Sequence, residues 1–231
     1  MINGSDGMKM EYSAILLLGG KSTRFNGSIN KVYSIIKDKP LFMYSLEKFI
    51  NDEDCIKIVV VYNEEDKELL FRYDISSSKI MYVLGGNERY KSVLNGLEFV
   101  QSEYVLVHDG ARPLITKLMI EDVLKELCNS DCVSVGLPVT DTLKKVNIDG
   151  CVSTVDRSCL YSVQTPQGTK TNILRQALSS VNEENLITDD LMAIEKHTNV
   201  NPKIILGSKK NVKVTTQEDL KLVEFYLGLG E

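Results

Sequence analysis

SAILLLGGKSTRF, residues 13–25, is the stretch that decides the fold. Its first six residues are nearly all apolar, which predicts a buried β-strand over residues 13–18. Two glycines follow this strand directly, and lysine, serine and arginine come soon after them. Because glycine lets backbone N–H groups approach an anion closely, the stretch predicts a strand that ends in a phosphate-binding turn.

The alternation of strand and helix continues along the chain. Four further apolar runs predict buried strands at residues 56–62, 80–84, 104–108 and 132–138. Helical patterns lie between them, at residues 41–49, from Asn87 onward, and at 117–128. Pro40 is expected at the first position of the first helix, and Asn87 as the cap of the second. This order predicts an α/β fold with a single Rossmann-like, doubly wound and mainly parallel sheet.

The loops that follow three of these strands are expected to form one site. In a doubly wound sheet, ligands bind in the crevice at the carboxyl ends of the strands. The loops after Leu18, Leu84 and His108 all leave from that edge. They should therefore converge.

The region 140–157 departs from the alternation. β-Branched residues flank the sequence NIDG at 147–150, and Asp149-Gly150 is a hairpin signal. We therefore predict a projecting β-arm at residues 140–157. Beyond the arm, the patterns predict two helices, near 171–180 and 188–197, with Thr188 as the cap of the second. They also predict strands near 204–206 and 212–214, and a last helix whose capping box starts at Thr216.

Composition and charge limit the class of protein. The 231 residues are 43% hydrophobic and 26% charged, as in ordinary globular proteins. A net charge of −5 argues against nucleic acid as a partner, and the apolar runs are too short to span a membrane. The five cysteines form no metal or disulfide pattern, which favours a cytoplasmic protein. We expect a flexible leader at residues 1–11 and one folded domain at residues 12–231.

The first loop is a candidate triphosphate site. It is not a P-loop, because Ile15 stands where that motif needs glycine, and Arg24 replaces the last glycine of the dinucleotide fingerprint. Arg24 and Lys31 are seven residues apart, so they can place two cations at different depths along a triphosphate. The alternative is an ordinary β–α turn with solvated charges.

Two more strand ends carry polar residues. Gly85-Gly86 leads into a helix N-terminus, which suits an anion or a base, although a plain glycine turn with an asparagine cap fits equally. Asp109 and Arg112 suit a metal ion or a second phosphate, and the alternative is a structural ion pair. His108 is interpreted as a packed residue at a strand end.

Taken in order, these segments resemble one family, the 2-C-methyl-D-erythritol 4-phosphate cytidylyltransferases of the non-mevalonate isoprenoid pathway, over residues 14–227. The most specific matches are VLVHDGARP at 105–113, QTPQ at 164–167, TDD at 188–190 and NVKVT at 211–215. The resemblance implies a homodimeric transferase that moves CMP from CTP to the polyol phosphate and releases pyrophosphate. It also implies Mg²⁺ held largely by the nucleotide phosphates, with Asp109 as the candidate protein ligand.

The resemblance also implies roles for individual residues. Arg24 and Lys31 would stabilise the triphosphate and the pentacoordinate transition state. The nucleotide would contact residues of the glycine loops and strand ends, namely Leu18, Gly19, Gly20, Ser22, Gly85, Gly86, Asn87, Arg89, Ser92 and Gly110. The acceptor would contact Asp109, Arg112, Thr142, Arg157, Thr165 and Lys213. Thr142 and Arg157 would reach from the arm into the site of the partner subunit.

The chain departs from the family pattern around the first loop. Ser22 replaces a glycine, Asn30 a proline and Val32 a glutamine, and Gly110-Ala111 stands where the family has two alanines. Ribitol-5-phosphate cytidylyltransferases share most motifs and are the nearest alternative, although TVDR at 154–157 and TDD at 188–190 favour the erythritol branch. More distant alternatives are a glycosyltransferase that uses a sugar nucleotide and a non-catalytic nucleotide-binding protein.

Overall fold

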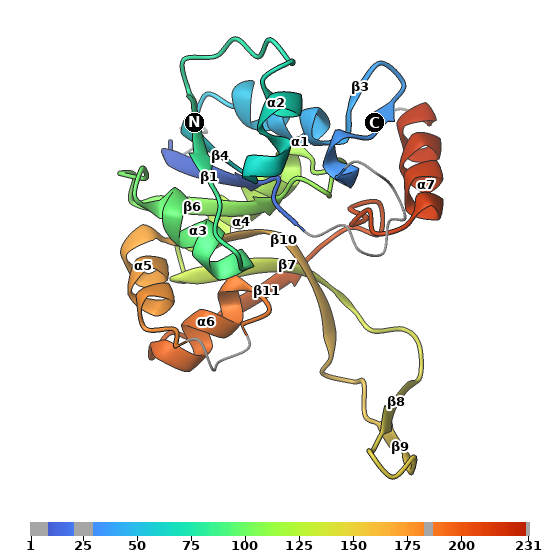
Figure 1. Cartoon of the computed structure of the whole chain (residues 1–231). Helices are drawn as coiled ribbons and strands as arrows, with labels where there is room; N and C mark the ends of the chain where they lie inside the picture. The colour runs from blue at the N-terminus through green and yellow to red at the C-terminus, as the bar shows by residue number, and fades with distance from the viewer. Residues whose placement is uncertain (1–8, 21–29, 183–186, 230–231) are drawn as a thin grey trace, which may run out of the picture.

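The computed structural model describes residues 9–20, 30–182 and 187–229. Its central sheet has seven strands in the order β11-β7-β10-β6-β1-β4-β5. The strands are β1 (Tyr12–Leu17), β4 (Cys55–Tyr62), β5 (Ile80–Leu84), β6 (Tyr104–Asp109), β7 (Cys132–Pro138), β10 (Tyr161–Lys170) and β11 (Lys203–Leu206). β10 is antiparallel to β6 and β7, and the other pairs are parallel. The predicted mainly parallel α/β sheet is confirmed (Figure 1).

Helices cover both faces of this sheet (Figure 1). One face carries α1 (Leu41–Ile50), α2 (Lys67–Leu70) and α4 (Lys117–Leu127), and the other carries α3 (Arg89–Leu97), α5 (Thr171–Ser179) and α6 (Asp190–His197). Along β1, Leu16 packs into the first layer, whereas Ile15 and Leu17 pack into the second. Successive side chains of a strand point to opposite faces, so a strand buried on both sides must be apolar throughout.

The strand order reverses at β1. β4 and β5 lie on one side of β1, and the chain then crosses back to place β6 on the other side. Such a switch point opens a crevice beyond the carboxyl ends of the strands. Gly19 and Gly20 follow β1 at this switch point. The loops that were predicted to converge leave the sheet around it.

A two-stranded arm leaves the sheet between β7 and β10 (Figure 1). It contains β8 (Leu143–Val146) and β9 (Val152–Val155), within the predicted range 140–157. The connecting turn covers residues 147–151, and Gly150 has a φ of 82°, a left-handed value that favours glycine. The arm is thus paired with itself and lies away from the main sheet.

Short elements complete the chain near the crevice. They are η1 (Lys31–Tyr33), β2 (Ile35–Ile36), β3 (Lys39–Pro40), η2 (Glu64–Asp66) and the last helix α7 (Gln217–Gly228). Thr216 and Asp219 form the predicted capping box of α7, and Val223 packs with Val214 and Leu41. Met10, inside the predicted leader, packs against the core, whereas residues 1–8 lie outside the described ranges.

Three helix starts differ from the prediction. Glu88 rather than Asn87 precedes α3, and the Ser92 hydroxyl holds that turn by bonding to Gly86 and to the carbonyl of Glu88. α6 is capped by Asp189 instead of Thr188, because the Asp189 carboxylate accepts from the backbone of the third helical residue. Pro40 ends β3 and stands just before α1.

Two strand predictions also need correction. Residues 212–214 form a loop, which the backbone of Val214 ties to Ala111 by a hydrogen bond of 2.8 Å. No sequence pattern predicts β10, because Pro166 lies within it. The strand tolerates the proline since its pairing with β7 is irregular between Val163 and Gln167. None of the helices in the described ranges is long and apolar enough to cross a membrane.

Candidate active site

The glycine loops line a hollow of about 450 Å³ at the carboxyl edge of the sheet, which we call the glycine hollow. It is lined by Gly19, Gly20, Asn63, Glu64, Glu65, Leu84, Gly85, Gly86, Asn87, Glu88, Arg89 and Ser92. Three chain segments meet here, after β1, after β4 and after β5. The predicted convergence of the loops after Leu18 and Leu84 is therefore confirmed.

Close contacts explain why glycine occupies three of these positions. A Cβ atom on Gly19 would lie 2.6 Å from Asn63 Oδ1, and one on Gly86 would lie 2.5 Å from the Cβ of Lys91. At Gly85 it would lie 2.9 Å from the hydroxyl of Ser92. At these three positions the wall of the hollow is therefore backbone, whereas the rest of the lining includes polar side chains such as Glu64 and Glu65.

A second hollow of about 220 Å³ adjoins the first, and we call it the cationic hollow. It is lined by Arg89, Asp109, Arg112, Val163, Gln164, Thr165, Gln167, Thr188, Asp189 and Lys213. Arg89 lines both hollows, so its side chain stands at the boundary between them.

Arg89 is held between two carboxylates. Its Nη2 is 2.9 Å from Asp190 Oδ2, and its Nε is 3.6 Å from Asp109 Oδ1. On its other oxygen, Asp109 pairs with Lys213 Nζ at 2.6 Å. This chain of four charges joins the start of α3, the end of β6, the start of α6 and the loop before α7.

The charge chain shifts the pKa values of both acids. Burial alone would raise the pKa of Asp109, but Arg89, Lys213 and Arg112 outweigh it and hold that pKa well below its usual range. At Asp190 burial dominates, so its pKa is raised despite the pairing with Arg89. Asp190 Oδ1 is buried and has no hydrogen-bond partner among the described residues.

His108 is buried and has a structural role, as predicted. Its Nε2 lies 2.9 Å from the carbonyl of Arg112, which can only accept, so Nε2 carries the proton. Its Nδ1 then accepts from the Thr165 hydroxyl at 3.0 Å, and that hydroxyl accepts from the backbone of Asp109 at 3.1 Å. Burial, opposed in part by the Arg112 carbonyl, lowers the pKa of His108 to about 4, so the ring is neutral near pH 7. The hydroxyl proton of Thr165 is committed to this network.

Arg112 has an unused donor beside the cationic hollow. Its Nη1 donates to the carbonyl of Asn211 at 2.8 Å, whereas its buried Nε has no partner among the described residues. The Asn211 side chain in turn donates to the carbonyl of Thr165 at 2.8 Å. The alternative considered for these two residues, an ion pair of Asp109 with Arg112, does not form, because Arg89 and Lys213 are the partners of Asp109.

Gln167 fixes the wall formed by α6, a role that no sequence pattern indicated. Its side-chain nitrogen donates to Asp189 at 3.0 Å, and its oxygen accepts from the backbone of Asp190 at 3.1 Å. Gln167, Asp190 and Asn211 each belong to one of the motifs that match the family, which are QTPQ at 164–167, TDD at 188–190 and NVKVT at 211–215. Their contacts span more than 20 residues of chain, so local spacing carries no signal for them.

Several other predicted residues fall in different surroundings. Ser22 and Arg24 lie outside the described residues. Leu18 is fully buried in the core, and Gly110 packs against it so tightly that a Cβ would lie 2.5 Å from Leu18 Cδ2. Both residues therefore shape the site through packing and backbone.

The two arm residues lie apart from the hollows of their own chain. Thr142 and Arg157 are exposed, and Arg157 donates to the carbonyl of Thr140 at the base of the arm. Neither residue lines the glycine hollow or the cationic hollow. Of the six residues predicted to contact the acceptor, four line the cationic hollow of one chain, namely Asp109, Arg112, Thr165 and Lys213.

The described residues form no protein cage for a metal ion. No group of three or more His, Cys, Asp or Glu side chains is placed to bind one within residues 9–20, 30–182 and 187–229. Asp109 is a poor Mg²⁺ ligand, because Lys213 and Arg89 already neutralise it and would repel a cation.

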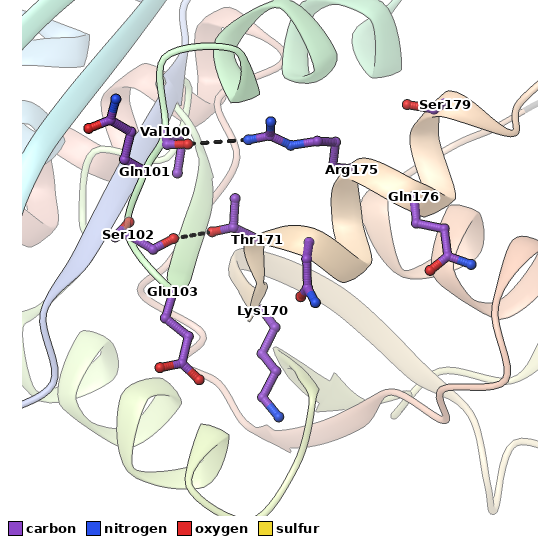
Figure 2. Close-up of a pocket in the computed structure, with 10 residues that line it drawn as sticks. Val100, Gln101, Ser102, Glu103, Lys170, Thr171, Arg175, Gln176 and Ser179 are labelled. Atoms are coloured by element: carbon purple, nitrogen blue, oxygen red, sulfur yellow. Dashed lines mark hydrogen bonds between the residues drawn. The ribbon is translucent and has the colours of Figure 1, made fainter.

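A hollow of about 770 Å³, larger than these two, lies beside Ser102 and Glu103, which precede β6 at its amino end (Figure 2). Its polar groups serve the fold: the Thr171 hydroxyl donates to the carbonyl of Ser102, and Arg175 donates to the carbonyls of Leu97 and Val100. Lys170 pairs with Asp131 at 2.7 Å. Since these groups are satisfied within the chain, this hollow is not the candidate site.

Comparison with known proteins agrees with the geometry of the carboxyl edge. The sequence pattern of the 2-C-methyl-D-erythritol 4-phosphate cytidylyltransferase family matches residues 13–229. Curated proteins of that name from Bacillus cytotoxicus and Lachnoclostridium phytofermentans are 38% and 40% identical, covering 94% of this chain and 97% and 96% of their own lengths.

Solved structures give the same result. A 4-diphosphocytidyl-2C-methyl-D-erythritol synthase from Anaerococcus prevotii has a TM-score of 0.83 and 25% identity, covering 95% of this chain and 99% of that one. The bifunctional IspDF from Campylobacter jejuni has a TM-score of 0.79 and 30% identity, covering 92% of this chain and 54% of that one.

Proposed function

Because the chain belongs to the 2-C-methyl-D-erythritol 4-phosphate cytidylyltransferase family, we propose that it transfers CMP from CTP to 2-C-methyl-D-erythritol 4-phosphate and releases pyrophosphate. As a member of this family, the protein is a nucleotidyltransferase of isoprenoid precursor synthesis. One observation carries the proposal for this chain. The glycine hollow and the cationic hollow adjoin at the switch point of the sheet and share Arg89 as their boundary.

The two hollows suit the two substrates. The glycine hollow offers the backbone of Gly19 and Gly20 and the N-terminal end of α3 to a nucleotide. The cationic hollow offers Lys213 and Arg112 to the phosphate of the acceptor, and the unpaired Arg112 Nε would gain a partner there. Asp109 would accept from hydroxyl groups of the polyol while its cations stay in place.

The proposed reaction is an in-line displacement. An oxygen of the acceptor phosphate attacks the α-phosphorus of CTP, a new P–O bond forms, and the bond from the α-phosphorus to the bridging oxygen breaks. The bond electrons leave with pyrophosphate. The acceptor phosphate is ionised at neutral pH, so no base is needed, and the commitment of His108 to Thr165 and Arg112 agrees with this.

The protein contributes positioning and charge. We assign Lys31 and Arg24 to the triphosphate, where cations offset the charge that develops at the transition state. Because the described residues do not fit a Mg²⁺ cage, Mg²⁺ would enter with the nucleotide phosphates, and no step depends on a protein-bound metal.

We further propose that the arm completes the site of a second subunit. The arm exposes the apolar side chains of Val146, Ile148 and Val152, and it carries Thr142 and Arg157. In a homodimer, these residues would be covered and would reach the partner's cationic hollow. The domain of residues 12–231 would act in this form in the cytoplasm, in line with five unpaired cysteines.

The test is an assay of pyrophosphate release from each of the four nucleoside triphosphates. 2-C-Methyl-D-erythritol 4-phosphate and D-ribitol 5-phosphate serve as parallel acceptors. We expect release only with CTP and the erythritol phosphate. Release with ribitol phosphate alone would assign the chain to the other branch, and hydrolysis without an acceptor would overturn the transfer reaction.

A further inference from the structure

Asn30 connects three elements next to residues that line the glycine hollow. Its side-chain nitrogen donates to the carbonyl of Leu18 at 2.9 Å, just after β1, and to Asp66 Oδ2 at 2.8 Å, in η2. Its side-chain oxygen accepts from the backbone of Val32 at 3.4 Å, at the start of η1. Lys31, the residue assigned to the triphosphate, lies between Asn30 and Val32 in the chain.

The contacts use both donors and one acceptor of a primary amide. An aspartate at this position cannot donate to the Leu18 carbonyl or to Asp66, and an alanine makes none of the three bonds. The backbone adds a further link, since the carbonyl of Asn30 accepts from the backbone of Tyr33 at 2.9 Å. The turn that carries Lys31 is therefore tied at both ends.

The elements that Asn30 joins also form the wall of the hollow. η2 contains Glu64 and Glu65, which line the glycine hollow, and it follows Asn63, which touches Gly19. On the other side of the turn, Val32 is buried in the core. A movement at position 30 would thus change the distance between Lys31 and the backbone that surrounds the nucleotide.

Position 30 differs between this chain and the family that it resembles. The family that the chain resembles has proline here, and the backbone of Asn30 has a φ of −59°, which proline also adopts. A proline ring restrains that φ covalently, whereas in this chain hydrogen bonds restrain the turn. The two residues meet the same geometric need by different means.

We propose that Asn30 is a positioning residue, whose amide holds the Lys31 turn against the end of β1 and against η2. Its effect on turnover rests on the proposed function, whereas its effect on the turn does not. A misplacement of a catalytic group by about 1 Å can cost 10²-fold in rate. Loss of the amide should therefore lower kcat more than it changes the KM for the acceptor.

The first experiment compares Asn30→Ala with the wild-type protein. We expect kcat to fall about 10-fold at saturating CTP and acceptor, with the acceptor KM within twofold. Asn172→Ala is the matched control, because its side chain accepts from a backbone N–H in the hollow beside Ser102 and Glu103, and it should retain full turnover. An Asn30→Ala enzyme with kcat within twofold of wild type would overturn the proposal.

Two variant series separate positioning from general damage. Asn30→Asp places a second carboxylate beside Asp66 and should lower kcat more than Asn30→Ala does. Combining Asn30→Asp with Asp66→Asn restores an amide–carboxylate pair with the two groups exchanged. We expect the double variant to recover kcat at least threefold over Asn30→Asp. In a Lys31→Ala background, Asn30→Ala should cost less than twofold, because it acts through Lys31. Equal losses in both backgrounds would contradict the proposal.

Amide hydrogen exchange tests the turn without any turnover. In Asn30→Ala, the backbone amides of Val32 and Tyr33 should exchange at least tenfold faster, while those of β6 should not change. Unchanged exchange would overturn the inference even in an active enzyme. An inactive wild type with normal protection of the turn would instead overturn only the proposed function.

Discussion

Arg89 has two carboxylate partners that lie far from it in the chain. Asp109 is 20 residues away and Asp190 is 101 residues away, and all three side chains are largely withdrawn from water. A buried charge is costly unless it is paired, so the three residues depend on one another. The consequence is a fully paired set of charges at the boundary between the glycine hollow and the cationic hollow.

Lys31→Ala tests the residue that we assign to the triphosphate. Loss of a cation aimed at developing charge should lower kcat roughly 10²-fold while the thermal unfolding midpoint stays nearly constant. Steady-state kinetics with CTP and the acceptor measure this loss. Lys125→Ala, an exposed change on α4, is the control, and turnover of Lys31→Ala near the control value would remove Lys31 from the mechanism.

His108 makes stability depend on pH in a defined direction. Its pKa is about 4 in the folded protein and ordinarily about 6.5, so the unfolded chain takes up a proton first as the pH falls. The contribution of neutral His108 to the free energy of unfolding is complete above about pH 6.5. It should decline by about 2 kcal/mol between pH 7 and pH 5. Urea unfolding at both pH values measures the decline.

His108→Gln is the comparison for this prediction. Glutamine can still donate to the Arg112 carbonyl and accept from Thr165, but it does not titrate. The variant should lose less stability than the wild type over the same pH interval. An equal loss would mean that other groups cause the pH dependence.

At the scale of elements, the junction of β1 with β6 sets the geometry of the crevice. The Gly110 backbone donates to the carbonyl of Leu17 at 2.9 Å, and a Cβ at this position would lie 3.0 Å from that oxygen. As these two strand ends are packed in this chain, a side chain at position 110 would require Leu18 to move. Asp109 and the first glycine loop are thereby brought to one place.

Gly110→Ala should strain the packing between these strand ends, because Leu18 in this chain occupies the space that the methyl group needs. The added methyl would overlap Leu18 Cδ2 and the Leu17 carbonyl, and we expect a loss of about 1–3 kcal/mol of stability together with a higher KM for CTP. Thermal unfolding and kinetics measure the two effects. Gly228→Ala is the control, since a Cβ there meets nothing within 4 Å, and an equal effect of both changes would contradict the prediction.

At the scale of the whole molecule, the arm is a segment whose strands pair only with each other and not with the central sheet. It projects away from the layers (Figure 1). The side chain of Ile148, in the turn of the arm, is fully exposed. An exposed apolar hairpin is typical of an interface, and a closed dimer would place each arm on the other subunit.

Mixing two inactive variants tests the arm directly. Arg157→Ala damages the arm, and Lys31→Ala damages the chain's own site, so a mixed dimer keeps one complete site. After exchange of subunits at equal amounts, we expect activity to rise to about a quarter of wild type, because half of the dimers are mixed. If each chain used its own arm, mixing would restore nothing.

The sequence by itself determined the fold class, the β-arm and the order of the loops around the crevice. These features follow from local causes: apolar runs that need two covered faces, glycines at strand ends, and the hairpin signal at Asp149-Gly150. The capping box at Thr216 is equally local, and it was predicted correctly.

Only the tertiary structure decided how the polar side chains are paired. Asp109 is bonded to Lys213 and Arg89 instead of Arg112, Gln167 holds the start of α6, and Asn30 reaches Leu18 and Asp66. Each of these contacts joins residues that are distant in the chain. Burial removes competing water, so the partner is chosen by which groups the packed sheet and helices bring within bonding distance.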